Sequence, residues 1–120
     1  MKLSYDLETL FVKAFDDERL QSIFYYTLLN DDIYVIGNND EENISFFSLF
    51  HEQENFIPIF LSKKSVLHFL ENEKMNFFKL NGKEVLELIK YENIVINPGQ
   101  KDSIVFYAEE IQDILNRGKN

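Results

Sequence analysis

The first thirty residues place their apolar side chains at the spacing of an α-helix. One stripe repeats at i, i+3, i+4, i+7 and i+8, and it consists of Leu7, Leu10, Phe11, Ala14 and Phe15. A second stripe with the same spacing consists of Leu20, Ile23, Phe24, Thr27 and Leu28. The pattern predicts helices over 6–15 and about 17–29, with Asp17 capping the second, and therefore a helical hairpin.

The period changes at Ile33, where short β-branched and aromatic runs begin. Strands are predicted over 33–37, 44–50 and 56–62, and polar turns separate them. Because consecutive strands joined by short loops usually pair, we expect an antiparallel meander. Pro58 has no backbone N–H, so we expect it at a sheet edge or a bulge.

The second half alternates helical patterns with short extended runs. Ser62 stands where a helix cap belongs, before the predicted helix 63–74. Further helices are predicted over 83–92 and 108–118, and extended segments over 76–82, 93–97 and 103–107. The pattern predicts one α+β domain over residues 1–120. It would consist of the helical hairpin, then an antiparallel-rich mixed sheet of about five or six strands with helices packed on it.

The composition is sufficient for a hydrophobic core without disulfide bonds. Apolar residues make up 45% of the 120 positions and aromatic residues 15%, and there is no cysteine. A disulfide framework and a thiolate metal site are therefore excluded. Asp6 and Glu8 interrupt the N-terminal segment where a signal peptide needs an apolar run, and no segment approaches the ~20 apolar residues of a membrane span. We expect a cytoplasmic protein.

The net charge of −9 is concentrated in the first half of the chain. Residues 1–60 hold 12 acidic and 3 basic side chains, whereas residues 61–120 hold 9 of each. An acidic field repels phosphates, so binding to nucleic acid or to an anionic membrane is not expected. Solubility is the simplest explanation of the charge, and attraction of a basic partner protein is the alternative.

The segment Asn97-Pro98-Gly99 has the chemistry of a tight turn. Pro98 fixes φ near −65° and Gly99 tolerates positive φ, which is the type II signature. Asn97 can open such a turn by bonding its own backbone. A turn between two strands accounts for all three residues.

Four short motifs also occur in a recognisable order. They are Phe24, Tyr25, Leu28 and Leu29 in the second helix, the strand from Ile33 to Gly37, the strand end Phe60-Leu61-Ser62, and Asn97-Pro98-Gly99. Together they resemble the SseB protein N-terminal domain family. Leu61 replaces the family's usual Thr, and Tyr107-Ala108 replaces a Thr-Pro helix start. The resemblance implies an α+β fold and a bacterial cytoplasmic protein, and it implies no established reaction.

Side chains for catalysis or metal binding are sparse in the sequence. His51 and His68 have no second His or Cys nearby to complete a metal site. No serine lies in a Gly-x-Ser-x-Gly elbow, and the four glycines form no phosphate-binding loop. The paired carboxylates fall at polar turns and helix ends, where solvent keeps both charged. We therefore expect no enzyme, no cofactor and no metal.

Two functional hypotheses remain open. The first is a non-catalytic protein-interaction domain, with immunity-like masking of a basic partner as one specific form. It would be a monomer or a weak homodimer. Its candidate binding residues are Tyr25, Tyr26, Asp31, Asp32, Asp40, Glu41 and Glu42.

The alternative hypothesis is a small-ligand-binding or enzymatic domain with a pocket near the Asn97 turn and the end of the third strand. Its candidate residues, which a purely structural turn would also explain, are Phe60, Ser62, Asn97, Pro98 and Gly99.

Overall fold

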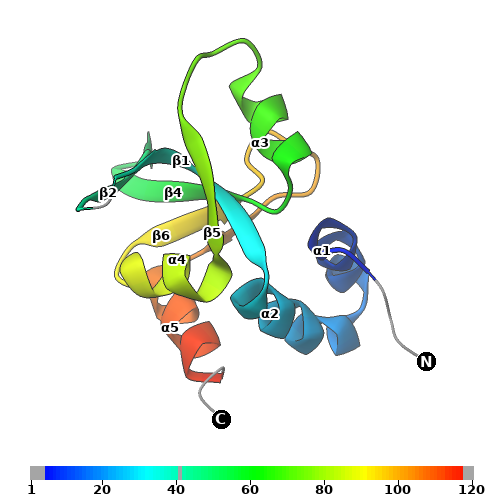
Figure 1. The fold of residues 1–120 in the computed structure, drawn as a ribbon. Helices are drawn as coiled ribbons and strands as arrows, with labels where there is room; N and C mark the ends of the chain where they lie inside the picture. Colours follow the sequence, from blue (N-terminus) through cyan, green and yellow to red (C-terminus); the bar gives the residue numbers. More distant parts are fainter. Residues whose placement is uncertain (1–4, 41, 118–120) are drawn as a thin grey trace.

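The computed structural model describes residues 5–40 and 42–117, which form a mixed sheet with helices on both faces (Figure 1). The helical elements are α1 (Leu7–Asp16), the 3-10 turn η1 (Glu18–Leu20), α2 (Gln21–Asn30), α3 (Lys63–Leu70), α4 (Gly82–Leu88) and α5 (Ala108–Arg117). The strands are β1 (Asp32–Asn39), β2 (Ile44–Phe46), β3 (Leu49–His51), β4 (Glu54–Phe60), β5 (Phe77–Asn81), β6 (Asn93–Ile96) and β7 (Ile104–Phe106). The predicted α+β class, with a helical hairpin ahead of the sheet, is confirmed.

The helical hairpin forms where the apolar stripes predict it. Asp6 caps α1 by accepting a hydrogen bond from the Thr9 backbone N–H at 2.7 Å, and this bonding to Thr9 lowers the pKa of the Asp6 carboxyl. Asp17 caps η1, and its hydrogen bonds with Arg19 lower its pKa in the same way. The predicted second helix is therefore two pieces, because the Asp17 cap starts a 3-10 turn before α2 begins.

The sheet has the strand order β2-β1-β4-β6-β7, with β5 paired to β1 and β3 paired to β4. All of these pairs are antiparallel except β4–β6, which is parallel and encloses α3, β5 and α4 in its crossover. The described residues contain seven strands, one more than the upper prediction, because the predicted strand 44–50 divides into β2 and β3.

The division of that strand also explains how the sheet accommodates Pro58, which has no backbone N–H. The prediction of an edge position is wrong, since β4 is an interior strand and Pro58 aligns with Val95 of β6. On the other side of β4, pairing with β3 ends at Phe56 and pairing with β1 begins only at Ile59. Pro58 falls in this gap, where no neighbouring strand needs its missing N–H.

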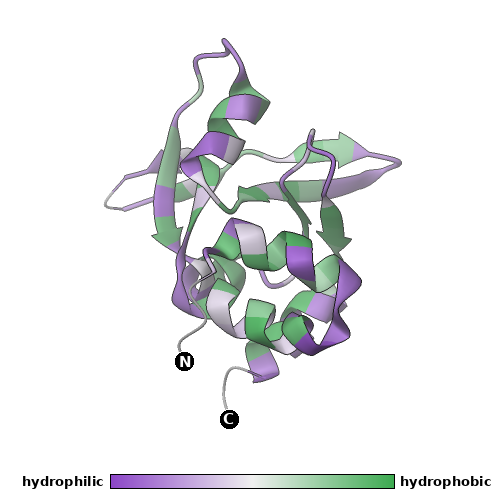
Figure 2. Cartoon of the chain, turned by 90° about the vertical axis from the view of Figure 1, so that its right-hand side faces the viewer, coloured by the Kyte–Doolittle hydropathy of each residue, from purple (hydrophilic) through white to green (hydrophobic). Residues whose placement is uncertain are grey.

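Two apolar layers hold the fold together, one on each face of the sheet. The larger layer lies between the sheet and the helices α1, α2, α4 and α5, and includes Ile59, Ile94 and Ile111, all fully buried. The smaller lies under α3 and joins Ile36, Phe60, Val66 and Leu70. Strands appear mostly apolar in Figure 2, whereas the helices show one apolar and one polar face. This placement follows the stripes read from the sequence.

Two predicted helices end early. The predicted helix 63–74 stops at Leu70, where Glu71 takes a positive φ of 51°, and the predicted helix 83–92 is α4, which ends at Leu88. Polar side chains fill residues 71–74, so that segment has no apolar face to bury. Ile89 stays in the core, but its backbone leaves the helical region at φ −116° and ψ 21° and ends α4 there.

A close backbone approach fixes the start of α4. The Gly82 N–H donates to the Asp31 carbonyl at 2.8 Å, and a Cβ at Gly82 would lie 1.7 Å from the Leu28 carbonyl oxygen. The first turn of α4 therefore packs directly on the end of α2.

We predict that Gly82→Ala destabilises the fold by about 3 kcal/mol, because the backbone of α2 or α4 must move to admit the methyl group. Gly99→Ala is the matched control. Its Cβ would meet nothing closer than 3.7 Å, so only its positive φ matters, at a cost of about 1 kcal/mol. Urea unfolding of both variants measures the difference, and equal losses would contradict the close packing at Gly82.

Candidate functional site

Asn97 occupies a buried corner where three segments meet. It is 1% exposed and has a positive φ of 51°, a backbone state that Asn adopts more readily than most residues. Its backbone N–H donates to the Ile59 carbonyl at 2.9 Å, and its side-chain oxygen accepts from the Leu61 N–H at 3.1 Å. Its side-chain nitrogen donates to Glu8 at 2.9 Å. The side chain thus links the end of β4, α1 and the end of β6. The prediction that it bonds its own backbone is wrong.

The turn after Asn97 has the predicted type II form. The Gln100 N–H donates to the Asn97 carbonyl at 3.3 Å, and Gly99 has a φ of 82°. Pro98 is buried and Gly99 is exposed. Phe60, the residue that ends β4 nearby, is fully buried and packs against Phe69. Phe60 and Pro98 therefore build the corner and present no exposed surface to a ligand.

The Glu8 carboxylate is held at the start of α3. Its Oε1 accepts hydrogen bonds from the hydroxyls of Ser62, at 2.9 Å, and of Ser65. Ser62 also caps α3 as predicted, by accepting from the Ser65 backbone N–H at 3.1 Å. A carboxylate is favourable at a helix N-terminus, because the peptide dipoles leave partial positive charge there. The Glu8 carboxylate therefore stabilises the N-terminal end of α3.

A small hollow of about 280 Å³ lies beside this corner. Glu8, Ser62, Lys64, Ser65, His68 and Gln100 line it. The Gln100 side-chain nitrogen is buried without a hydrogen-bond partner. The serines and Asn97 already satisfy the carboxylate of Glu8. The hollow is therefore polar, but much of its hydrogen-bonding capacity is used internally.

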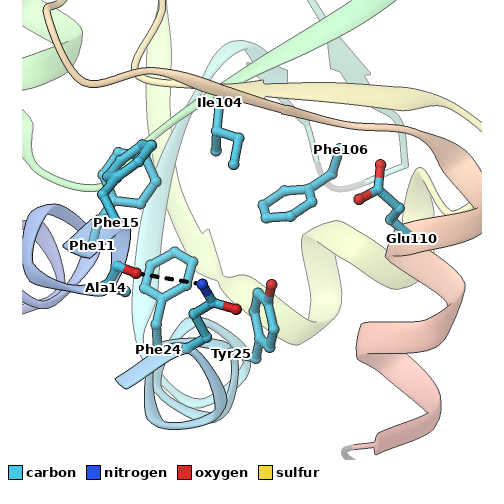
Figure 3. Close-up of a pocket in the computed structure, with 9 residues that line it drawn as sticks. Phe11, Ala14, Phe15, Phe24, Tyr25, Ile104, Phe106 and Glu110 are labelled. Atoms are coloured by element: carbon cyan, nitrogen blue, oxygen red, sulfur yellow. Dashed lines mark hydrogen bonds between the residues drawn. The ribbon is translucent and has the colours of Figure 1, made fainter. Parts of the chain in front are cut away.

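A second, apolar hollow opens between the helical hairpin and the last strand (Figure 3). It measures about 260 Å³ and is lined by Phe11, Ala14, Phe15, Gln21, Phe24, Tyr25, Ile104, Phe106 and Glu110. A neighbouring hollow of about 240 Å³ shares Tyr25 and is lined by Ser22, Tyr26, Leu29, Ile114 and Arg117. We call the two hollows together the aromatic groove.

Aromatic side chains in the groove pack against one another, and two of them remain largely open to solvent. The Phe11 and Phe15 rings meet edge to face at 5.0 Å between centroids, and the Tyr25 and Phe106 rings do so at 6.0 Å. Phe15 is nevertheless 45% exposed and Tyr26 69% exposed. Large apolar surface left open beside a preformed hollow is typical of a docking site.

The two hollows of the groove differ in the charge that lines them, Glu110 in the larger and Arg117 in the smaller. Glu110 is the charged residue that lines the larger hollow, and Asp16 and Glu18 follow Phe15 in the chain. Arg19 is engaged with Asp17 at 2.9 Å, and the Arg117 guanidinium lies 5.6 Å from the centre of the Tyr25 ring. Arg19 is thus paired with a carboxylate, whereas Arg117 keeps its positive charge beside the smaller hollow.

The predicted partner-binding residues do not gather on one surface. Tyr25 and Tyr26 line the groove, with Tyr25 half-buried and Tyr26 exposed. Asp31 and Asp32 are exposed at the junction of α2 and β1. Asp40 and Glu42 belong to the turn between β1 and β2, at the end of the sheet away from α1 (Figure 1). Glu41 lies outside the described residues.

Metal-binding geometry is not found in the part of the chain that the structure describes. No three His, Asp or Glu side chains there converge on one point. His51 lies 3.7 Å from Glu52 on the exposed end of β3, and His68 lines the polar hollow alone among the histidines.

None of the described helices has the length and hydrophobicity needed to cross a membrane.

Comparison with known protein families identifies the class of this domain. The model of the SseB protein N-terminal domain family matches residues 7–113, nearly the whole chain. The protein therefore belongs to the SseB N-terminal domain family. No curated protein and no solved structure matches the chain significantly.

Several residues of both sites are absent from the sequence-based candidates. Glu8 lies next to Leu7 at the border of the first apolar stripe, and a carboxylate in that position is the one signal that it faces the protein. Ser65 and Gln100 carry no such signal. Phe106 is a core residue that also lines the larger hollow. Phe15 reads as a core position, because a sequence pattern cannot show where one packed layer extends past the edge of the other.

We predict that Asn97→Ala lowers the free energy of unfolding by about 3 kcal/mol, since it loses buried hydrogen bonds and keeps an unfavourable φ. Asn97→Gly loses the same side-chain bonds without the φ penalty, so it should cost about 1 kcal/mol less. Chemical unfolding of the two variants separates the contributions. If the alanine variant is as stable as the native protein, Asn97 does not hold the corner.

Proposed function

We propose that this domain is a non-catalytic protein-interaction module that binds another protein through the aromatic groove. The observation that carries the proposal is the pair of apolar hollows on either side of Tyr25, with Phe15 and Tyr26 left exposed at their margins. Aromatic residues of this kind dominate the binding energy of protein interfaces. The cytoplasmic location and the bacterial origin stay predictions.

The charge distribution supports a basic partner. The Glu110 carboxylate lines the larger hollow, and the first half of the chain carries the whole net charge of −9. Such a field attracts a basic protein over a distance and accelerates its encounter with the groove. Masking of a basic partner, as an immunity protein does, is one form of this function.

The test is capture of a partner from a lysate of the native host by the immobilised domain and by two variants. Phe15→Ser combined with Tyr26→Ser removes the exposed apolar margins of the groove. Phe50→Ser is the matched control, since Phe50 is 72% exposed but lies on β3 and outside both hollows. We expect one protein that the native domain and the Phe50 variant retain and the groove variant loses.

The charge predicts a second property of the same complex. Retention should fall at least about tenfold between roughly 50 mM and 500 mM salt, since screening weakens attraction between exposed charges. A partner captured equally by all three proteins would contradict binding in the groove, and a domain that retains nothing at either salt would contradict the function.

A small polar ligand in the hollow beside Asn97 is the second candidate function. The observation that favours it is the buried Gln100 side-chain nitrogen, which has no partner and could donate to a ligand. Lys64 and His68 add a cation and a second donor at the same hollow. The hollow is smaller than most drug-sized sites, so the ligand would be small.

This candidate predicts fragment binding that moves one side-chain amide signal. In nuclear magnetic resonance spectra of the ¹⁵N-labelled domain, polar fragments should shift the Gln100 amide, and Gln100→Leu should abolish their binding. The Gln112 amide, which already donates to the Lys90 carbonyl at 3.2 Å, is the internal control. Fragments that leave Gln100 unmoved would remove this candidate.

A further inference from the structure

The strand β7 forms one end of the main strand order, and the aromatic groove lies against it. We propose that the groove receives an extended, basic segment of the partner, which adds to the sheet as a further strand along β7. This inference rests on the proposed function and names the kind of partner segment that the groove selects.

The ladder between β4 and β6 determines which backbone groups of β6 face β7. Ile59 pairs with Ile96, and the Ile59 carbonyl accepts from the Asn97 N–H. In a parallel ladder a residue bonds to the two residues that flank its partner. Val95 and Asn97 therefore turn their backbone groups toward β4, and Ile94 and Ile96 turn theirs toward β7.

The same reasoning identifies the open groups of β7. Ile104 pairs with Ile96 and Phe106 pairs with Ile94, so the backbone groups of Ile104 and Phe106 bond to β6. The N–H and C=O of Val105 consequently point away from the sheet. No other strand of the described chain pairs with β7. Val105 is 36% exposed, in keeping with an open edge.

The groove lies next to this open edge. Ile104 and Phe106 project from β7 toward the helical hairpin, with Phe15 near the Ile104 end and Glu110 near the Phe106 end (Figure 3). A strand added to β7 would continue the sheet about 4.8 Å further out. Two of its side chains, at i and i+2, would then point to the same side as Ile104 and Phe106 and enter the larger hollow.

The charges at the two ends of the groove set the flanking chemistry. Glu110 lies at one end, and Asp16 follows Phe15 at the other. Lys or Arg two positions outside the two apolar residues would lie on the same side of the added strand and meet these carboxylates. The selected segment therefore has the pattern basic–any–apolar–any–apolar–any–basic, and it is extended. Strand addition to an exposed edge combines backbone affinity with side-chain pockets in this way.

The length of β7 limits the contribution of the backbone. Three residues form the strand, and the Tyr107 N–H beyond it is already taken by the Glu110 carboxylate at 3.1 Å. Val105 supplies the outward pair of hydrogen bonds, and the hollow supplies the rest of the affinity. A short edge also explains why the domain can leave it open, because brief edges resist unspecific pairing.

The experiment uses random twelve-residue peptides displayed on phage, selected on the intact domain and counter-selected on Val105→Pro. Proline removes the outward N–H and is tolerated on an edge strand, and circular dichroism checks that the variant folds. We expect the enriched peptides to share the predicted pattern. The best peptide should bind at least about tenfold more weakly to Val105→Pro and to Phe15→Ser, and with unchanged affinity to Phe50→Ser.

A second measurement keeps the proposal testable if Val105→Pro does not fold. Methylation of alternate backbone nitrogens in the best peptide should abolish binding in one register and spare it in the other, since only one set of N–H groups faces β7. Equal effects in both registers would overturn strand addition.

The remaining outcomes separate this inference from the proposed function. Peptides with helical spacing, or peptides sensitive to Phe15→Ser but not to Val105→Pro, would overturn strand addition and leave the groove as a binding site. A domain that dimerises through this edge, with dissociation by Val105→Pro in sedimentation experiments, would make a second copy the occupant and overturn the inference. A library without enriched peptides would overturn it as well.

Discussion

The fold depends on one buried polar contact, the link between Asn97 and Glu8. Asn97 connects the end of β6 to β4 through the backbone and to α1 through the side chain, and Glu8 connects α1 to the start of α3. A buried carboxamide and the partly buried carboxylate that it contacts are stable together only when their hydrogen bonds are complete. Because the serines and Leu61 complete this network, the contact fixes where α1 sits relative to the sheet.

The position of α1 in turn shapes the groove. Glu8 fixes the N-terminal half of α1 beside α3, so the C-terminal half carries Phe11 and Phe15 toward β7. The sheet ends at β7, and the helical hairpin leaves an apolar hollow against that edge. Because the helical hairpin extends past the last strand of the sheet, part of its aromatic surface stays open. The polar corner and the aromatic groove thus lie at opposite ends of α1.

Periodicity was sufficient to predict the class of fold and most elements. The stripe from Leu7 to Ala14 buries one helix face, and the run from Ile33 to Ile36 contributes to the apolar layers on both faces of the sheet. Such patterns decide local structure. The turn at Pro98-Gly99 followed from backbone chemistry alone. These features depend on residues close in sequence.

The errors and omissions involve contacts between distant residues. Pro58 sits in an interior strand because its neighbour changes from β3 to β1 at that point, which no local pattern records. Asn97 was expected to bond its own backbone, and Glu8, 89 positions away, takes the side chain instead. The groove escapes the sequence pattern for the same reason, since Phe15 looks like a core residue until the edge of the sheet is located.

The polar hollow and the aromatic groove differ in which groups they leave without a partner. In the polar hollow, Glu8 accepts from Ser62, Ser65 and Asn97, so a ligand would have to compete with bonds that also support the fold. In the groove, the open groups are aromatic faces. Displacing water from these faces lowers the free energy of the complex. Asp31 and Asp40 line neither hollow of the groove and add to the negative field of the domain. The field would therefore set how fast a basic partner arrives, and the groove would set which segment stays bound.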